Sequence, residues 1–248
     1  MKKGEHHLLL VWLMLISLIG FALFLALKEK VLLLLYLGDS SKLSWVITLM
    51  FIIITIYCAR RVWFISLEIN NSEKVCALAR RHDLSVQEDE IYLDGREKLP
   101  DCLLTRYLLD LFYRAQSAPA EADQAESNTL NANNKELIEV FEAKLKNPHN
   151  LGWFFTDIMI KLGLLGTIIG FVLMLGSVVN VTDFDVTTMQ NILKEMSSGM
   201  GTALYTTFAG LTCSILTAAQ FHLLDQAADE LVDTTKHLTQ VHILPRLT

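Results

Sequence analysis

The four longest apolar stretches of the sequence contain no Asp, Glu, Lys or Arg, and this absence limits what the chain can do alone. The stretches cover residues 8–27, 43–59, 162–179 and 196–224. Each is long enough to cross a hydrocarbon core of about 30 Å as a helix. A proton relay inside a membrane normally needs a titratable group there. If the chain takes part in moving protons, we therefore expect a partner to supply the carboxylate.

Cysteine and positive charge are also scarce. The four cysteines stand apart from one another, at Cys58, Cys76, Cys102 and Cys213. Without a CxxC pair they predict neither a metal site nor a disulfide. The net charge of −6 leaves no basic face for nucleic acid. The seven histidines lack metal-ligand spacing, and no phosphate-binding loop, nucleophile elbow or HExxH motif occurs. We expect no cofactor, no metal and no enzymatic activity.

What the sequence does contain is apolar surface gathered into blocks. Hydrophobic residues make up 52% of the chain and its mean hydropathy is +0.38, whereas soluble domains rarely exceed about half. We predict an all-α membrane protein with four transmembrane helices. The second should extend through residues 63–65, and residues 31–37 should lie at the interface or lengthen the first hairpin. Residues 8–27 could be a signal peptide, but their length and the lack of a cleavage site favour a retained helix.

Basic residues near the span ends indicate the orientation of the chain. Two arginines at 60–61 follow the second span, Lys161 precedes the third and Lys236 lies beyond the fourth. Lysines on both sides of the first span weaken the assignment there, so the later spans decide it. Both termini and residues 66–155 are expected in the cytoplasm. Residues 180–195 would form a short acidic connection on the outer side.

The predicted domains follow from this layout. They are a transmembrane hairpin at 1–65, a helical cytoplasmic segment at 66–155, a second transmembrane hairpin at 156–224 and a cytoplasmic tail helix at 225–248. Polar residues at about 116–134 predict a flexible linker inside the cytoplasmic segment. The helix that resumes at 135–146 is expected to end at Asn147-Pro148. No internal repeat is found.

The tail helix is expected to be amphipathic and to continue the fourth span. Its leucines recur every seven residues from Leu224 to Leu238, and its acidic residues recur every four, at Asp225, Asp229 and Asp233. In an oligomer these carboxylates could line a cytoplasmic vestibule and attract cations. A solvated helix face is the commoner meaning of such a stripe.

Two segments in the last two spans combine small residues with hydroxyl groups. Within 162–179, one helix face carries Gly163, Gly166, Thr167 and Gly170. Within 196–224, a similar stripe carries Ala203, Thr207, Gly210 and Ser214, and Thr206 lies in the adjacent stripe. Such faces let another helix approach closely, with room beside it for water or an ion.

These stripes also have a simpler interpretation. Hydroxyl side chains in membrane helices often bond only to their own backbone, and small-residue faces often only pack helices together. From the periodicity alone, packing is the favoured interpretation and an ion pathway is the alternative.

The order of the motifs resembles that of the MotA/TolQ/ExbB family of proton or sodium channel subunits. The penultimate span of the family carries a pattern similar to GLxGTxxG, which residues 163–170 match. Its last span carries a pattern similar to ALxxTxxGL, which residues 203–211 match. The resemblance extends over about residues 150–225. The four-span layout is similar to the MotA branch, whereas TolQ and ExbB have three spans.

The resemblance implies an assembly in the bacterial inner membrane. Subunits of this kind form a homopentamer around two copies of a MotB/ExbD/TolR-like single-span protein, whose membrane Asp carries the ion. Thr167 and Thr207 match the polar positions beside that Asp, and ion flow is expected to rotate the pentamer around its partners. Thr206 gives a Thr-Thr pair similar to that of sodium-type flagellar stators, and oxygen ligands suit a hard cation. The translocated ion is H⁺ by default, with Na⁺ as the alternative.

Residues 66–155 do not resemble the rotor-binding domain of MotA, so the process that such a motor would drive is not indicated. A passive membrane scaffold or assembly protein without ion conduction is the rival interpretation. A secondary transporter is less favoured, because that class usually shows inverted repeats and broken helices.

Overall fold

The computed structural model divides the chain into two compact units. The residues it describes are 7–79, 84–87, 90–93, 97–116, 125–179 and 186–243. We call the first the membrane unit, which consists of Val11–Arg60 and Asn150–His222. We call the second the tail unit, which consists of Met1–Leu10, Arg61–His149 and Leu223–Thr248. The longest helices contribute residues to both units.

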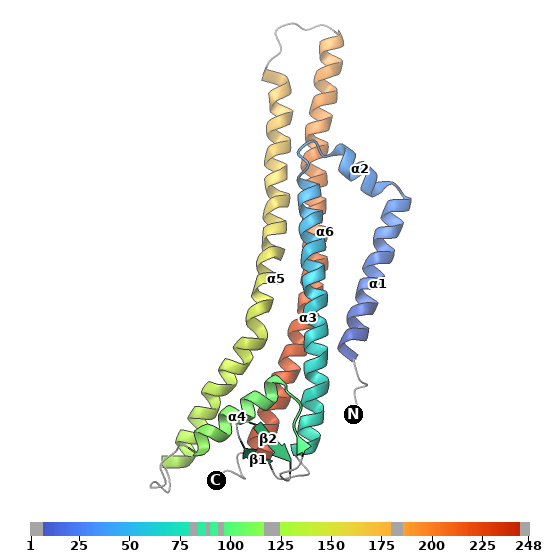
Figure 1. Ribbon diagram of the computed structural model, residues 1–248. Helices are drawn as coiled ribbons and strands as arrows, with labels where there is room; N and C mark the ends of the chain where they lie inside the picture. Colours follow the sequence, from blue (N-terminus) through green and yellow to red (C-terminus); the bar gives the residue numbers. More distant parts are fainter. Residues whose placement is uncertain are drawn as a thin grey trace. The chain divides into compact units, whose positions relative to one another are not determined.

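Helices account for most of the described residues (Figure 1). They are α1 (His7–Lys28), α2 (Val31–Gly38), α3 (Leu43–Ala79), α4 (Leu103–Gln116), α5 (Ala125–Val179) and α6 (Val186–Leu238). A π-helical turn, Thr239–Ile243, follows α6. Among the described residues, four helices are long and apolar enough to cross a membrane: α1, α3, α5 and α6. This confirms the prediction of an all-α membrane protein with four spans.

Large apolar side chains on the spanning helices point away from the protein. Met14 on α1 is 75% exposed, and Leu49 on α3 is 61% exposed. Such surfaces would be a liability in water. Hydrocarbon solvates them, while each helix keeps its backbone polar groups paired internally.

A small antiparallel sheet lies between α3 and α4, within the segment that the sequence predicts to be helical. Strands β1 (Leu84–Gln87), β2 (Glu90–Leu93) and β3 (Glu97–Lys98) pair in the order β1-β2-β3. Val86 lies opposite Ile91, and Leu93 lies opposite Glu97. The sheet is a local addition to a chain that is otherwise helical where it is described.

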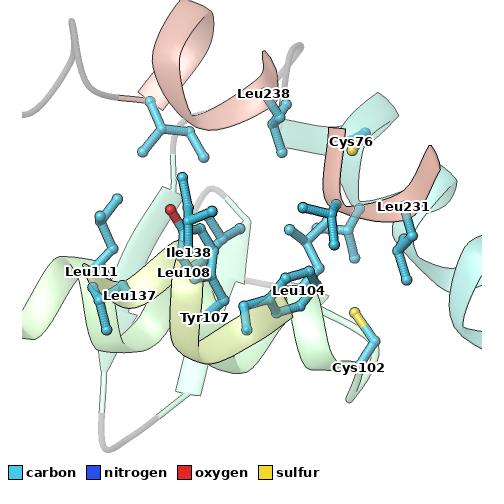
Figure 2. Close-up of a cluster of buried hydrophobic side chains, with 14 of the residues drawn as sticks. Cys76, Cys102, Leu104, Tyr107, Leu108, Leu111, Leu137, Ile138, Leu231 and Leu238 are labelled. Atoms are coloured by element: carbon cyan, nitrogen blue, oxygen red, sulfur yellow. The ribbon is translucent and has the colours of Figure 1, made fainter. Parts of the chain in front are cut away.

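The core of the tail unit forms where leucine-rich helix faces meet (Figure 2). Leu104 and Leu108 on α4 are fully buried. Leu145 on α5 is also fully buried and belongs to the same cluster. Leu231 and Leu238 on α6, which are 3% and 1% exposed, pack in the same cluster. Burial of each such side chain contributes about 1.5–3 kcal/mol. The leucine spacing of the tail is therefore explained by this core.

Two connections are shorter in the structure than the sequence predicts. The linker expected at about 116–134 is helical from Ala125, where α5 begins, and residues 117–124 lie outside the described residues. The connection expected at 180–195 is helical from Val186, where α6 begins. Both segments are polar. Polar residues lower the hydropathy by which a membrane span is recognised, but they can still form a helix.

The helix expected to end at Pro148 continues through it. α5 contains Pro148 in its interior and runs on to Val179. Proline removes one backbone donor and crowds the preceding turn. A donor from outside the helix reaches that turn, because Arg61 Nη2 on α3 donates to the carbonyl oxygen of Leu145 at 2.8 Å. In membrane proteins, groups from neighbouring helices commonly support a proline-containing helix in this way.

Candidate functional site

Glycines let α5 and α6 pack in direct backbone contact in the membrane unit. A Cβ atom added to Gly163 would lie 3.2 Å from the Cα atom of Gly210. One added to Gly170 would lie 2.6 Å from the backbone nitrogen of Ala203, and one added to Gly166 would overlap the Thr206 side chain. We call this contact the glycine seam. Its closeness is the property that small residues provide between membrane helices.

The seam includes five of the six residues predicted for helix packing. The sixth, Ser214, is buried farther along α6. Two further glycines with close contacts were not predicted from the sequence. A Cβ added to Gly199 would lie 2.8 Å from the carbonyl oxygen of Gly170, and a side chain at Gly152 would overlap the Phe221 ring. Gly199 could have been found, because it precedes Ala203 by four residues and extends the same stripe.

Thr206 lies inside the seam. Its side chain is fully buried, and its Oγ1 donates to the carbonyl oxygen of Thr202 at 2.9 Å, within α6. Its side chain occupies the space beside Gly166 that a larger residue at position 166 would need. This position fits the packing interpretation, in which such hydroxyls bond to their own backbone and small-residue faces pack helices together.

Thr167 and Thr207 are half-buried and keep part of their surface. Thr207 Oγ1 lies 3.1 Å from the carbonyl oxygen of Ala203 and 3.3 Å from that of Gly163, so it can bridge α6 to α5. Thr167 Oγ1 donates to the carbonyl oxygen of Leu164 at 2.5 Å, within α5. With the hydroxyl hydrogen donated to the backbone, each oxygen retains acceptor capacity. These two oxygens can therefore accept a hydrogen bond from a protonated group, or contact a cation.

The loop between α2 and α3 packs against α6 at residues that alternate with those of the seam. Ser40 donates its backbone N–H to Thr202 Oγ1 at 3.2 Å, and that oxygen lies 3.3 Å from the carbonyl oxygen of Gly38. A side chain at Gly38 would overlap the Tyr205 ring. The loop thus fixes the turn of α6 that carries Thr206 and Thr207.

Asp39 holds this loop in shape. Its carboxylate accepts the backbone N–H groups of Ser41 at 2.9 Å and Ser44 at 2.8 Å. The second bond satisfies a free donor in the first turn of α3. Burial alone would raise the pKa of Asp39, but the hydrogen bonds from Ser41 and Ser44 outweigh it and lower the pKa below the ordinary value.

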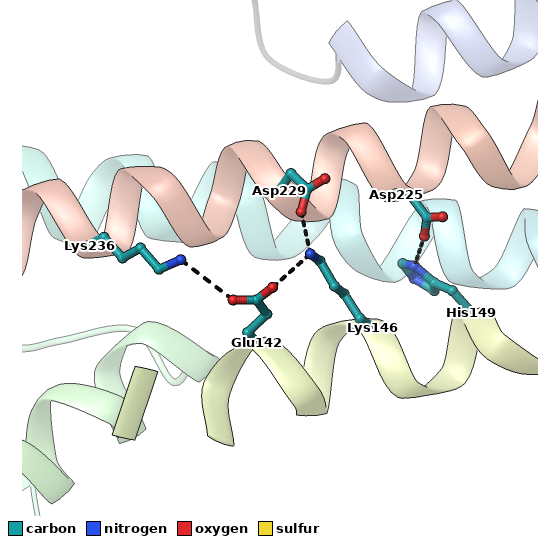
Figure 3. A network of polar contacts seen from close by, with 6 residues as sticks. All are labelled: Glu142, Lys146, His149, Asp225, Asp229 and Lys236. Carbon is teal, nitrogen blue, oxygen red and sulfur yellow. Dashed lines mark hydrogen bonds and ion pairs between the residues drawn. The ribbon is translucent and has the colours of Figure 1, made fainter. Parts of the chain in front are cut away.

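In the tail unit, side chains of α5 and α6 form a network of polar contacts (Figure 3). Lys146 Nζ lies 2.6 Å from Asp229 and 2.7 Å from Glu142, which Lys236 also approaches at 3.5 Å. His149 Nδ1 lies 2.6 Å from Asp225 Oδ1. Nothing in the sequence marked His149, because its partners are distant along the chain.

The network involves two of the three carboxylates predicted to line a vestibule. Asp225 and Asp229 face α5, and Asp233 is exposed. Asp229 and Asp233 border an open depression of about 610 Å³ on α6, lined also by Gln226, Glu230, Thr234 and His237. The vestibule stays a prediction. No group of three potential metal ligands occurs among the described residues.

Comparison with known proteins identifies one relationship. The model of the MotA/TolQ/ExbB proton channel family matches residues 106–237, which is more than half of the chain. The match includes the seam residues of α5 and α6 and the network of the tail unit. No curated protein and no solved structure matches the chain.

Proposed function

Because the chain belongs to the MotA/TolQ/ExbB proton channel family, we propose that it is the ion-conducting stator subunit of an ion-driven motor in a bacterial inner membrane. The observation that supports this most directly is the glycine seam. It lies inside the family match and presents two half-buried hydroxyls, Thr167 and Thr207, beside a close helix contact. Such a subunit converts the energy of ion flow into mechanical work and is not an enzyme.

The proposed assembly is a homopentamer around two copies of a single-span partner that carries a membrane Asp. The four apolar stretches contain no Asp or Glu of their own, so the carboxylate must come from elsewhere. Both seam helices also offer apolar surface, with Ile168 62% and Phe208 54% exposed. Neighbouring subunits, the partner or lipid would cover such surface. Both termini are placed in the cytoplasm in this proposal.

In the proposed ion site, the oxygens of Thr167 and Thr207 contact the partner's carboxyl group. A protonated carboxyl group can donate a hydrogen bond to a threonine oxygen, and each of the two oxygens has acceptor capacity. Thr206 contributes no oxygen unless the seam opens, because it is fully buried against Gly166. Two accessible hydroxyls in place of three support H⁺ as the translocated ion. Na⁺ remains the alternative.

The test is ion flux in vesicles that contain the chain and the single-span protein encoded beside it. Thr207→Val keeps the shape of the side chain and removes its oxygen, so flux should fall about tenfold, as expected for one lost hydrogen bond in the conducting state. Thr217→Val is the matched control, because Thr217 is buried on the same helix and donates to Cys213. Normal flux in both Thr167→Val and Thr207→Val would remove the hydroxyls from the mechanism.

One observation favours a second candidate, a passive scaffold. Thr167, Thr206 and Thr207 all donate to backbone carbonyl oxygens, as threonines do when they only pack helices. A scaffold would show no coupled flux with any partner, although the complex would still assemble. The same vesicle experiment therefore separates the two candidates.

A further inference from the structure

A buried histidine in the tail unit is held by one acidic and one basic partner. His149 follows Pro148 on α5 and is 1% exposed. Its Nδ1 lies 2.6 Å from Asp225 Oδ1 on α6, as Figure 3 shows. Its Nε2 lies 3.4 Å from Arg61 Nε on α3. The imidazole therefore connects three helices.

These partners define the protonation state of the ring. A guanidinium group has only N–H donors and no acceptor. The Nε2 atom that Arg61 contacts must therefore present its lone pair. The single proton of the neutral ring then lies on Nδ1, where it is donated to the Asp225 carboxylate. His149 is thus a neutral histidine with its proton on Nδ1, and the hydrogen bonds of its neighbours set this tautomer.

A second proton on His149 would disrupt this arrangement. It would add to Nε2 and direct an N–H group at the N–H group of Arg61. Lys146, one turn earlier on α5, adds a further positive charge, and Asp225 supplies the nearest negative one. Arg61 also holds the Leu145 carbonyl oxygen at 2.8 Å, so its displacement would weaken the contact of α3 with the turn before Pro148.

We propose that His149 is a proton-binding site, distinct from the hydroxyls of the glycine seam, whose occupation releases Arg61 from α5. Its ligand is a proton from the aqueous side, which can arrive through Asp225 because the side chain of Asp225 is 29% exposed. An effect of this release on ion flux rests on the proposed function. The binding of the proton and the loss of the Arg61 contact do not.

The first test is nitrogen NMR of the full chain in lipid nanodiscs with isotope-labelled histidine. At about pH 8 one ring should carry its proton on Nδ1, and His149→Gln should remove that signal. His237→Gln is the matched control, because His237 is exposed on α6, and it should leave the signal in place. A signal from His149 with the proton on Nε2, or from an imidazolium at this pH, would overturn the proposal.

The second test is the melting temperature between about pH 8 and about pH 5, where histidine titrates. Glutamine can donate its amide N–H to Asp225 and accept from Arg61 with its carbonyl oxygen, so it replaces the neutral ring without titrating. The melting temperature of the wild type and of His237→Gln should fall on acidification. The fall should be smaller in His149→Gln, and an equal fall in all three would contradict the proposal.

The contribution of Arg61 has its own control. Arg61→Lys cannot supply the same fork of donors to His149 and Leu145, so it should reduce the difference between neutral and acid melting temperatures. Arg60→Lys changes the exposed arginine beside it and should behave as wild type, whereas identical pH profiles in the two variants would contradict the role of Arg61. If no partner supports ion flux, the proposed function fails, while the NMR and melting results still decide the proton site.

Discussion

At the scale of single residues, two neighbouring threonines have different surroundings. Thr206 is sealed against Gly166, whereas Thr207 retains surface and lies within reach of the Gly163 carbonyl oxygen. The sequence predicts both as ion-pathway residues, because a motif gives positions and not the direction that each side chain takes. Successive residues on a helix point about 100° apart, so the partner helix decides which one is covered. Only the structure supplies that helix.

The tight contact at Gly166 predicts a large cost for one methyl group. Gly166→Ala would place Cβ inside the Thr206 side chain, and overpacking of this kind costs about 1–3 kcal/mol. Gly176→Ala on the same helix is the matched control, because an added Cβ meets nothing within 4 Å there. Unfolding in detergent should show a loss of stability only in the first variant. Equal stability of both would mean that the seam is looser than described.

Asp39 predicts a dependence of stability on acid. Its pKa is lowered in the folded chain, so its contribution is present above the ordinary carboxyl value of about 4 and is lost as the pH falls through the folded value. Asp39→Ala should cost about 1 kcal/mol at neutral pH, as loss of a capping residue does. Asp110→Ala, at an exposed position on α4, should cost less. Melting curves should show a larger difference between wild type and Asp39→Ala near pH 7 than near pH 3.

At the scale of elements, the spans could be predicted and their ends could not. Apolar length alone indicates α1, α3, α5 and α6, because the membrane imposes one simple requirement. The strands β1 and β2 leave only a weak strand pattern in the sequence, around Ser85 and Val86 and around Ile91 to Leu93. These runs are too short to outweigh the helical pattern on either side of them. Arg61, which donates to the turn before Pro148, lies 87 positions away and cannot be paired with that turn from sequence.

Pro148 predicts a gain in stability when it is removed. Proline in a helix interior costs up to about 3 kcal/mol relative to alanine, so Pro148→Ala should raise the melting temperature. Pro100→Ala is a suitable control, because Pro100 precedes α4 and its carbonyl oxygen can still accept from Thr105. A lower melting temperature for Pro148→Ala would show that the ring itself packs favourably. If the turn also bends during transport, flux should fall although the protein is more stable.

At the scale of the whole molecule, the family match and the four spans support an ion-driven assembly. The charged residues of the tail helix offer a test of the predicted cytoplasmic vestibule. Asp233 is exposed, while Asp229 is paired with Lys146. If these carboxylates attract cations in a pentamer, Asp233→Asn should lower flux severalfold at low salt and little at high salt, because screening weakens the attraction. Lys144→Gln changes an exposed charge on α5 and serves as the control.

Flux that is unchanged at both salt concentrations in Asp233→Asn, and also in the variant with Asp225, Asp229 and Asp233 all changed to Asn, would exclude the vestibule. The triple variant must be checked for stability. It removes the partners of His149 and Lys146, so a loss of flux with a loss of folding would not support the vestibule.

The continuity of α5 has a mechanical consequence. A helix of 55 residues has a contour length of about 80 Å, well over twice the thickness of the hydrocarbon core. In a helix each backbone hydrogen bond links one turn to the next, so the backbone resists torsion. Pro148 lies inside α5 and has no N–H group to donate, so one backbone hydrogen bond of the helix is missing there. Bending or twisting of α5 is therefore expected to be easiest at this turn.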